Sequence, residues 1–120
     1  SNDVASVTQS AADYADVVYI PTDNTAASNT EAIANILVPA GVPAIVGEEG
    51  ICSGCGVATL SISYYDLGVT TGKMAAKILT GEADISTMPI EYTDATPKYN
   101  PTICEALNIT PLDGYTAIEG

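Results

Sequence analysis

Short apolar runs recur along the chain and predict buried strands. Residues 16–21 (DVVYIP), 43–46 (PAIV) and 57–62 (VATLSI) are such runs, and polar or glycine residues follow each of them. Continuous apolar runs are typical of parallel strands that are buried on both faces. Residues 88–92 (MPIEY) predict a fourth strand.

Between these runs, apolar positions recur at the three- and four-residue spacing of amphipathic helices. We expect helices over residues 3–14, 26–38, 64–79 and 101–107. Ser28 and Glu31 have the spacing of a capping box, while Pro39 and Gly41 predict the end of the second helix. Strands that alternate with helices favour an α/β fold, in three α/β/α layers around a mostly parallel sheet. The Pro- and Thr-rich tail from Tyr92 onward is expected to wrap over the fold rather than to build its core.

Composition narrows the possible functions. Fifteen Asp and Glu residues face three Lys, no Arg and no His, for a net charge of −12. Nucleic acids require clustered cations, so they are excluded as partners. The absence of His excludes Ser-His and Cys-His catalytic triads, and no cofactor motif occurs. No apolar run approaches the roughly 20 residues of a membrane span. The chain starts at Ser1 without an initiator Met, so we expect a fragment whose targeting segment lies upstream.

Candidate binding residues follow the ends of the predicted strands, where open α/β sheets bind ligands. They are Thr22, Asp23, Asn24 and Thr25 after the first strand, Glu48 after the second, and Ser63 and Tyr64 after the third. Polar side chains and helix-terminal amides at the first loop could recognise an α-amino acid. The alternatives are helix capping for the first loop and Ser63, a solvated loop for Glu48 and Glu49, and core or interface packing for Tyr64.

The cysteines form one C-x-x-C pair, Cys52 and Cys55, with Cys104 left over. A zinc site needs further Cys or His ligands, so no metal site is expected. The pair is predicted in a glycine-rich loop, whereas a redox pair belongs at a helix N-terminus. A local disulfide or free thiols remain as alternatives, and Cys104 is expected to pack as a small apolar side chain.

Five segments in the same order resemble the ABC transporter substrate-binding family that includes tryptophan and tyrosine binders. They are residues 15–25 (ADVVYIPTDNT), 42–50 (VPAIVGEEG), 58–68 (ATLSISYYDLG), 71–84 (TGKMAAKILTGEAD) and 105–109 (EALNI). The resemblance implies a periplasmic-binding-protein-like fold of two lobes that close on a ligand. It further implies that residues 22–25 contact the amino-acid backbone of the ligand and that Glu48 lies at the cleft. Ser63 stands where the family usually has Asp, which weakens a charged contact to the ligand at that position.

The resemblance implies that this chain is the C-terminal half of such a protein. Residues 1–62 would be the bulk of the second lobe, and residues 63–120 the returning helix, strand and C-terminal segment. The expected function is extracytoplasmic capture of a small molecule for delivery to a permease, with an amino acid as the expected ligand and aromatic amino acids among the candidates. The expected location is the periplasm or, for a lipoprotein, the cell surface. A further expected partner is the missing N-terminal part, and a second copy of the fragment is a candidate. Two alternatives stay open: a redox or regulatory domain that uses Cys52 and Cys55, and a sugar-binding or signalling lobe of the same architecture.

Overall fold

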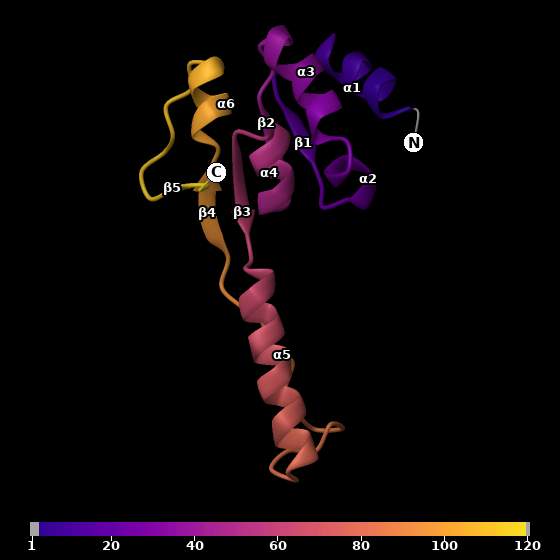
Figure 1. Ribbon diagram of the computed structural model, residues 1–120, viewed down its shortest axis with the longest axis vertical. Coiled ribbons are helices and arrows are strands. Elements are labelled where there is room, and N and C mark those ends of the chain that lie inside the picture. Colours follow the sequence, from indigo (N-terminus) through magenta and orange to yellow (C-terminus); the bar gives the residue numbers. More distant parts are fainter. Residues whose placement is uncertain (1–2, 120) are drawn as a thin grey trace. The chain divides into compact units, whose positions relative to one another are not determined.

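A five-stranded sheet organises the larger of two structural units in the computed structural model, which describes residues 3–119 (Figure 1). This unit contains the described residues up to Ser61 and those from Thr96 onward. Its strands are β1 (Val18–Ile20), β2 (Ala44–Val46), β3 (Ala58–Ser61), β4 (Thr96–Tyr99) and β5 (Thr116–Ala117). Their order in the sheet is β1-β2-β3-β4-β5, and every neighbouring pair is parallel except the antiparallel pair β3 and β4. The predicted α/β fold with a mostly parallel sheet is confirmed.

Six helices occur in the described residues. They are α1 (Val4–Ala12), α2 (Asn24–Ala27), α3 (Thr30–Ala40), α4 (Glu49–Cys55), α5 (Tyr64–Leu79) and α6 (Pro101–Ala106). Both ends of α5 agree with the prediction, and α1 and α6 lie inside their predicted ranges. All of them except α5 belong to the larger unit.

The helix predicted over residues 26–38 is instead two helices, α2 and α3. The hydroxyl of Ser28 donates to the carbonyl of Asn24 (2.8 Å) at the end of α2, so the predicted capping box of Ser28 and Glu31 is wrong. Helix α3 continues through Pro39. Gly41 then ends it in the left-handed conformation (φ 72°), which glycine adopts at little steric cost.

The C-terminal tail contributes to the sheet and to the core, contrary to the expectation that it would only wrap over the fold. Residues 88–92 form no strand, whereas β4 and β5 lie in the tail. The side chains of Ile103, Cys104 and Ile118 are buried. The strand character of β4 was hidden because its sequence contains Pro97 and Lys98. Since β5 pairs only with Lys98 and Tyr99, Pro97 lies outside that ladder.

The main core fills the space between the sheet and the helices α3 and α4. Ala44 and Val46 of β2 are buried there, against aliphatic residues of α3 and against Ile51, Cys52 and Cys55 of α4. A smaller cluster of Val57, Ile103 and Cys104 lies between β3 and α6. Val18 and Ile20 of β1 pack on the main core as half-buried residues. Burial along β2 alternates with a period of two, so the helices cover one face of this part of the sheet.

The smaller unit, residues 62–95, consists of α5 and the segment that follows it. Leu67, Met74 and Ile78 form the half-buried side of α5, and no residue of this helix is fully buried. Met74 and Ile78 line a cavity of about 320 Å³ together with Ile85 and Met88. The helix ends before Gly81, which has a φ of 79°. The predicted division into residues 1–62 and 63–120 refers to the lobes of a longer protein and stays a prediction.

Candidate functional site

The carboxyl ends of three parallel strands meet at one edge of the larger unit. β1 ends at Ile20, β2 at Val46 and β3 at Ser61 (Figure 1). Open α/β sheets bind their ligands outside this edge. We call residues 21–25 and 47–50, which follow β1 and β2, the carboxyl edge.

The two loops of the carboxyl edge approach each other at Thr22 and Gly47. The amide of Gly47 donates to the carbonyl of Ile20 (2.9 Å). A Cβ atom on Gly47 would lie 2.7 Å from both the amide nitrogen and the Oγ1 atom of Thr22. Only glycine fits there without a shift of the backbone, so Gly47 holds the two loops in contact.

Residues 22–25 are exposed and open the short helix α2. The carboxylate of Asp23 accepts a hydrogen bond from the amide of Ala26 (2.9 Å), so this residue is the N-cap of α2. No side-chain hydrogen bond joins Thr22, Asn24 or Thr25 to another residue among those that the structure describes. Asp23 and Thr25 also line a cavity of about 260 Å³ between α1 and α2. The capping interpretation therefore holds for Asp23, and the other three side chains are available to a ligand.

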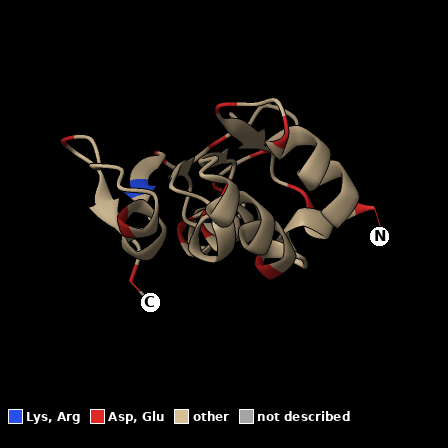
Figure 2. Ribbon diagram, turned by 90° about the horizontal axis from the view of Figure 1, so that it is seen from above, with Lys and Arg blue, Asp and Glu red and all other residues tan. Residues whose placement is uncertain are grey.

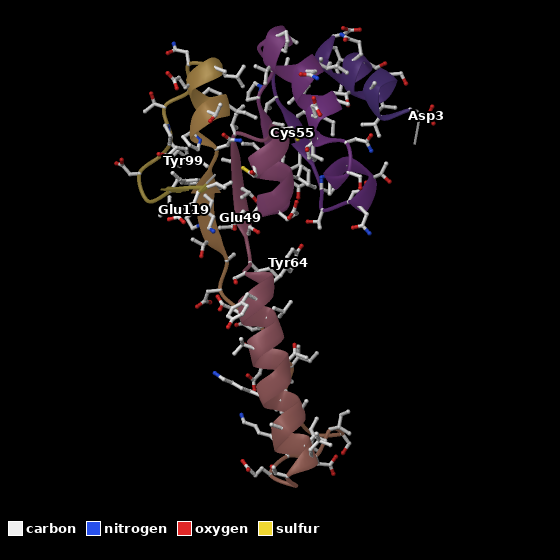
Figure 3. The ribbon with its side chains drawn as sticks, viewed as in Figure 1. Asp3, Glu49, Cys55, Tyr64, Tyr99 and Glu119 are labelled. Carbon is white, nitrogen blue, oxygen red and sulfur yellow. The ribbon has the colours of Figure 1, made fainter. Side chains whose placement is uncertain are left out.

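Glu48 and Glu49 lie at the start of α4 and point to different partners. The half-buried Glu48 is the N-cap of α4, and its carboxylate accepts from the amides of Gly50 (2.9 Å) and Ile51. Glu49 follows in the first turn of α4 (Figure 3). Its carboxylate accepts from the Nζ atom of Lys98 at 2.7 Å. The ion pair joins α4 to β4. Sequence reasoning missed Lys98 because it did not predict β4.

The carboxyl edge carries negative charge that no cation of the larger unit, as far as the structure describes it, compensates. Lys98 is the only Lys among the described residues of the larger unit, which has ten Asp and Glu residues. Figure 2 shows these acidic residues spread over helix ends and loops. Since Lys98 is taken up by Glu49, the carboxylates of Asp23 and Glu48 have no cationic partner within that unit as described. Such an edge attracts an ammonium group and repels a carboxylate.

Ser63 and Tyr64 belong to the smaller unit, at the start of α5 (Figure 3). The Oγ atom of Ser63 accepts from the amide of Asp66 (3.1 Å), which confirms the predicted N-cap. Tyr64 is 59% exposed. The structure thus brings Thr22, Asp23, Asn24, Thr25 and Glu48 together on the carboxyl edge, while Ser63 and Tyr64 lie in the other unit.

The cysteines lie in the core and not in the predicted loop. Cys52 and Cys55 are part of α4, and both, like Cys104, are free and buried. Burial raises the pKa of Cys52 to about 12, with the neighbouring Cys104 as the second cause, and burial raises the pKa of Cys55 to about 11. Reactive cysteines need a lowered pKa and access to solvent, so this arrangement does not favour redox chemistry.

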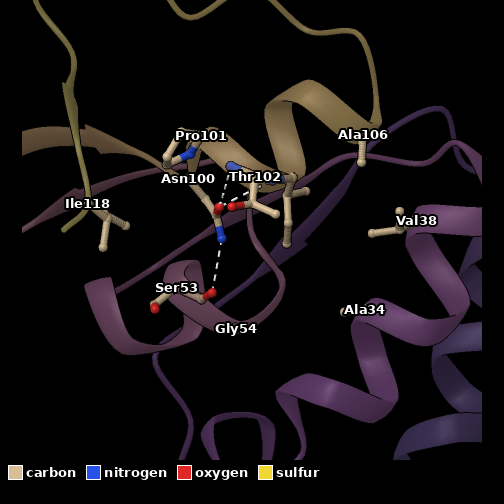
Figure 4. Close-up of a pocket in the computed structure, with 10 residues that line it drawn as sticks. Ala34, Val38, Ser53, Gly54, Asn100, Pro101, Thr102, Ala106 and Ile118 are labelled. Carbon is tan, nitrogen blue, oxygen red and sulfur yellow. Dashed lines mark hydrogen bonds between the residues drawn. The ribbon is translucent and has the colours of Figure 1, made fainter. Parts of the chain in front are cut away.

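A second cavity of the larger unit lies away from the carboxyl edge. It has a volume of about 430 Å³ and is lined by Ser53 and Gly54 of α4, Ala34 and Val38 of α3, and residues of α6 (Figure 4). Ser53 and Gly54 lie toward the C-terminal end of α4, whereas the carboxyl edge meets its N-terminal end. The buried amide of Asn100 at its wall has four hydrogen-bond partners within the chain. The side chain of Asn100 is thus committed to the fold.

Among residues 3–119, no helix combines the length and the apolar character that crossing a membrane requires.

Three similar proteins are substrate-binding proteins by name or are solved in complex with an amino acid. The chain is 32% identical over 81 residues to a tyrosine-binding protein of Clostridioides difficile (strain R20291), covering 68% of this chain and 23% of that protein. It is similar to the ligand-free, open structure of a substrate-binding protein with adhesive properties from Clostridium difficile, with a TM-score of 0.78 and 31% identity. It is also similar to an ABC domain from Streptococcus pneumonia in complex with L-Trp, with a TM-score of 0.81 and 27% identity. Each solved comparison covers 98% of this chain and 41% of the other chain.

The chain therefore spans about a quarter of the named relative and two fifths of the solved chains. A family model for ABC transporter substrate-binding proteins matches residues 1–114. Proteins of this family bind solutes and are not enzymes, so the family agrees with the prediction that the chain is not an enzyme. Because the match extends over nearly the whole sequence, the chain belongs to the ABC transporter substrate-binding protein family.

Proposed function

We propose that this chain forms one side of an amino-acid site in an extracytoplasmic solute-binding protein that delivers its ligand to an ABC permease. The observation that carries the proposal is the carboxyl edge, where Thr22, Asn24 and Thr25 are exposed beside the carboxylates of Asp23 and Glu48. The relatives support an amino acid as the ligand, because one is named a tyrosine-binding protein and another was solved with L-Trp.

The charge of the carboxyl edge sets the orientation of the ligand. The ammonium group of an amino acid faces Asp23 and Glu48, and the hydroxyl of Thr22 and the amide of Asn24 supply neutral hydrogen bonds. The carboxylate of the ligand is held by other parts of the protein, since this edge would repel it.

Ser63 and Tyr64, in the smaller unit, stay proposed ligand contacts on the grounds of the sequence alone. The ring of Tyr64 is more than half exposed, so it is free to cover an apolar ligand side chain. Ligand binding would then shift an equilibrium between open and closed forms, and the permease would recognise the closed form. Because the chain spans about two fifths of its solved relatives, the intact protein is expected to bind more tightly than residues 1–120 alone.

The decisive experiment is calorimetric titration of the intact protein with tyrosine, tryptophan and phenylalanine. Tyramine, which keeps the ammonium group but lacks the carboxylate, and N-acetyltyrosine, which lacks the ammonium group, separate the two ends of the ligand. We expect N-acetyltyrosine to bind more weakly than tyrosine, because without an ammonium group it loses the contacts to the carboxyl edge. An intact protein that binds none of the natural amino acids, aromatic or aliphatic, would contradict the proposed ligand class.

Two substitutions test the proposed orientation. Asp23→Asn and Glu48→Gln remove the charges but keep an oxygen that can cap α2 and α4. Each is expected to weaken tyrosine binding about tenfold, the equivalent of one charge-assisted hydrogen bond. Asp113→Asn, at an exposed position outside the carboxyl edge, is the matched control. If both variants bind tyrosine as the control does, the ammonium group does not face this edge.

The location of the protein, on which delivery to a permease depends, is tested separately from its ligand. Fractionation of the source cells with an antibody against this chain should recover the intact protein outside the cytoplasm. Recovery only in the cytoplasmic fraction would contradict both the delivery role and the proposed lipoprotein anchor.

A further inference from the structure

A cavity between α1 and α2 adjoins the carboxyl edge. It has a volume of about 260 Å³ and is bounded by the first turns of α1 and by the start of α2 (Figure 1). We call it the α1–α2 cavity, and its lining residues are Asp3, Val4, Val7, Thr8, Asp23, Thr25 and Ala26. Because Asp23 and Thr25 also belong to the carboxyl edge, a ligand that is bound at that edge lies next to this cavity.

The wall of the α1–α2 cavity is mostly apolar. Val4 and Val7 of α1 and Ala26 of α2 supply its apolar surface. The side chain of Val7 is 64% exposed, so it is accessible to a ligand. An apolar cavity of about 150 Å³ is large enough to hold a benzene molecule. The α1–α2 cavity therefore has room for one aromatic ring, which would take the exposed surface of Val7 out of water.

Two hydroxyl groups interrupt this apolar wall, those of Thr8 and Thr25. A Ser or Thr inside a helix commonly donates to the carbonyl one turn earlier. Ser10 of α1 does so, with a bond of 2.9 Å to the carbonyl of Ser6. Among the residues that the structure describes, no side-chain hydrogen bond joins Thr8 or Thr25 to another residue. Both hydroxyls are therefore available to a polar group in the cavity.

The charges at the α1–α2 cavity disfavour an acidic side chain. The carboxylates of Asp3 and Asp23 line the cavity, and no Lys is among its lining residues. They repel a second carboxylate of the ligand. A cationic side chain would be attracted to Asp3, but it would have to give up part of its hydration against Val4 and Val7. The apolar surface and the hydroxyls together suit a neutral side chain that is apolar along its length and carries one polar group.

We propose that the α1–α2 cavity receives the side chain of the amino-acid ligand and selects a phenol, the side chain of tyrosine. Its ring packs on Val7, and its hydroxyl bonds to Thr8 or Thr25, while the ammonium group stays at Asp23. Val7 and Thr8 are thus specificity-determining residues on α1, a helix from which the sequence predicted no ligand contact. This inference rests on the proposed function, because it concerns the ligand of the same site.

The first test is the preference of the intact protein for tyrosine over phenylalanine, measured by calorimetric titration. Thr8→Val keeps the branched shape of the side chain and removes its hydroxyl. We expect the parent to bind tyrosine about tenfold more tightly than phenylalanine, and Thr8→Val to lower this ratio about fivefold through weaker tyrosine binding. Thr71→Val is the matched control, because Thr71 is exposed on α5 and its hydroxyl donates to Leu67 (2.8 Å). An unchanged ratio in Thr8→Val would overturn the assignment of the hydroxyl.

The second test concerns the apolar wall. Val7→Ser should weaken the binding of tyrosine and of phenylalanine alike, by about fivefold, because less apolar surface is buried. Val17→Ser is the matched control, since Val17 is 55% exposed and lies outside the cavity. Melting temperatures of the two variants show that each is folded. If Val7→Ser binds both ligands as Val17→Ser does, the side chain of the ligand does not lie in this cavity.

These outcomes separate the inference from the function on which it rests. A parent protein that binds tyrosine while the Val7 and Thr8 variants bind it equally well overturns the inference and leaves the proposed function standing. Tighter binding of lysine than of tyrosine also overturns the inference, in favour of a cationic side chain beside Asp3. A parent protein that binds no amino acid overturns both.

Discussion

Replacement of Asn100 is expected to lower the free energy of unfolding of the larger unit strongly. It precedes α6, is 7% exposed and uses its amide group in both directions (Figure 4). Its Nδ2 atom donates to the carbonyls of Cys52 (3.0 Å) and Ser53 (2.9 Å) in α4. Its Oδ1 atom accepts from the amides of Thr102 (3.0 Å) and Ile103 (3.2 Å) as the N-cap of α6. One side chain therefore ties α4 to α6.

The expected loss of stability follows from the two sets of hydrogen bonds that Asn100 makes, those that cap α6 and those that it donates to α4. Loss of the N-cap costs about 1 kcal/mol. Loss of the two donated bonds takes the side-chain donor from the carbonyls of Ser53 and Cys52, the second of which still accepts from the amide of Gly56 (3.1 Å). Each lost bond costs about 1 kcal/mol. Asn100→Ala should therefore lower the free energy of unfolding by about 3 kcal/mol, a large share of the 5–15 kcal/mol typical of a folded protein. Asn100→Ser keeps an N-cap oxygen, so it should cost about 2 kcal/mol.

The assay is equilibrium unfolding in urea, followed by far-ultraviolet circular dichroism. Asn29→Ala is the control, because its amide makes one exposed bond to the carbonyl of Thr25 (2.7 Å), and its side chain does not cap α3. We expect less than about 1 kcal/mol for that variant. If Asn100→Ala costs no more than Asn29→Ala, the network does not stabilise the unit and the reasoning is wrong. If Asn100→Ser and Asn100→Ala unfold at the same urea concentration, the cap contributes nothing measurable.

Two further predictions concern the carboxyl edge and the buried thiols. Gly47→Ala should weaken amino-acid binding by the intact protein, because its Cβ would lie 2.7 Å from Thr22. Gly72→Ala in α5 is the control: nothing lies within 4 Å of its Cβ, so it should leave binding unchanged and add about 0.5–1 kcal/mol of stability. Calorimetry measures the affinity of each variant, and urea unfolding measures its stability. Equal affinities of the two variants for the amino acid would contradict the close-contact argument. The pKa values of Cys52 and Cys55 in the folded state are about 12 and 11, against 9.0 for an ordinary thiol. Because the thiols of the unfolded chain ionise first as the pH rises, the stability is fully present below pH 9 and declines above it. Urea midpoints at rising pH test this, and a Cys52→Val variant that declines as steeply as the parent would refute the assignment.

The sequence predicted those elements whose local pattern agrees with their packing. The apolar runs gave β1, β2 and β3, and the periodicity of residues 64–79 gave α5 with both of its ends. β4 was not predicted, because its sequence T-P-K-Y has neither an alternation of apolar and polar residues nor an apolar run. Its strand character comes from pairing with β3, a contact between segments about forty residues apart that no local window contains.

The segment around Cys52 and Cys55 was wrongly predicted as a loop, because glycine occurs both in turns and at close contacts between packed elements. Gly50, Gly54 and Gly56 favoured a loop around the C-x-x-C pair, yet residues 49–55 form α4. A Cβ on Gly54 would lie 2.3 Å from Thr30 Oγ1, and one on Gly56 would lie 2.8 Å from the side chain of Val46. These two glycines allow close packing rather than a turn. Such a need depends on the neighbours in space, so it cannot be seen in the sequence.

The sign of the charge at the candidate site illustrates the same limit. The strand ends identified Thr22, Asp23 and Glu48 as neighbours, but they could not say which carboxylate would be neutralised. That depends on Lys98, which lies on the unpredicted β4 and pairs with Glu49 at 2.7 Å. Since no cation among the described residues of the larger unit pairs with Glu48, this carboxylate favours an ammonium group. The orientation proposed for the ligand is thus a consequence of the antiparallel pairing of β3 and β4, which brings Lys98 level with Thr59 and within reach of α4.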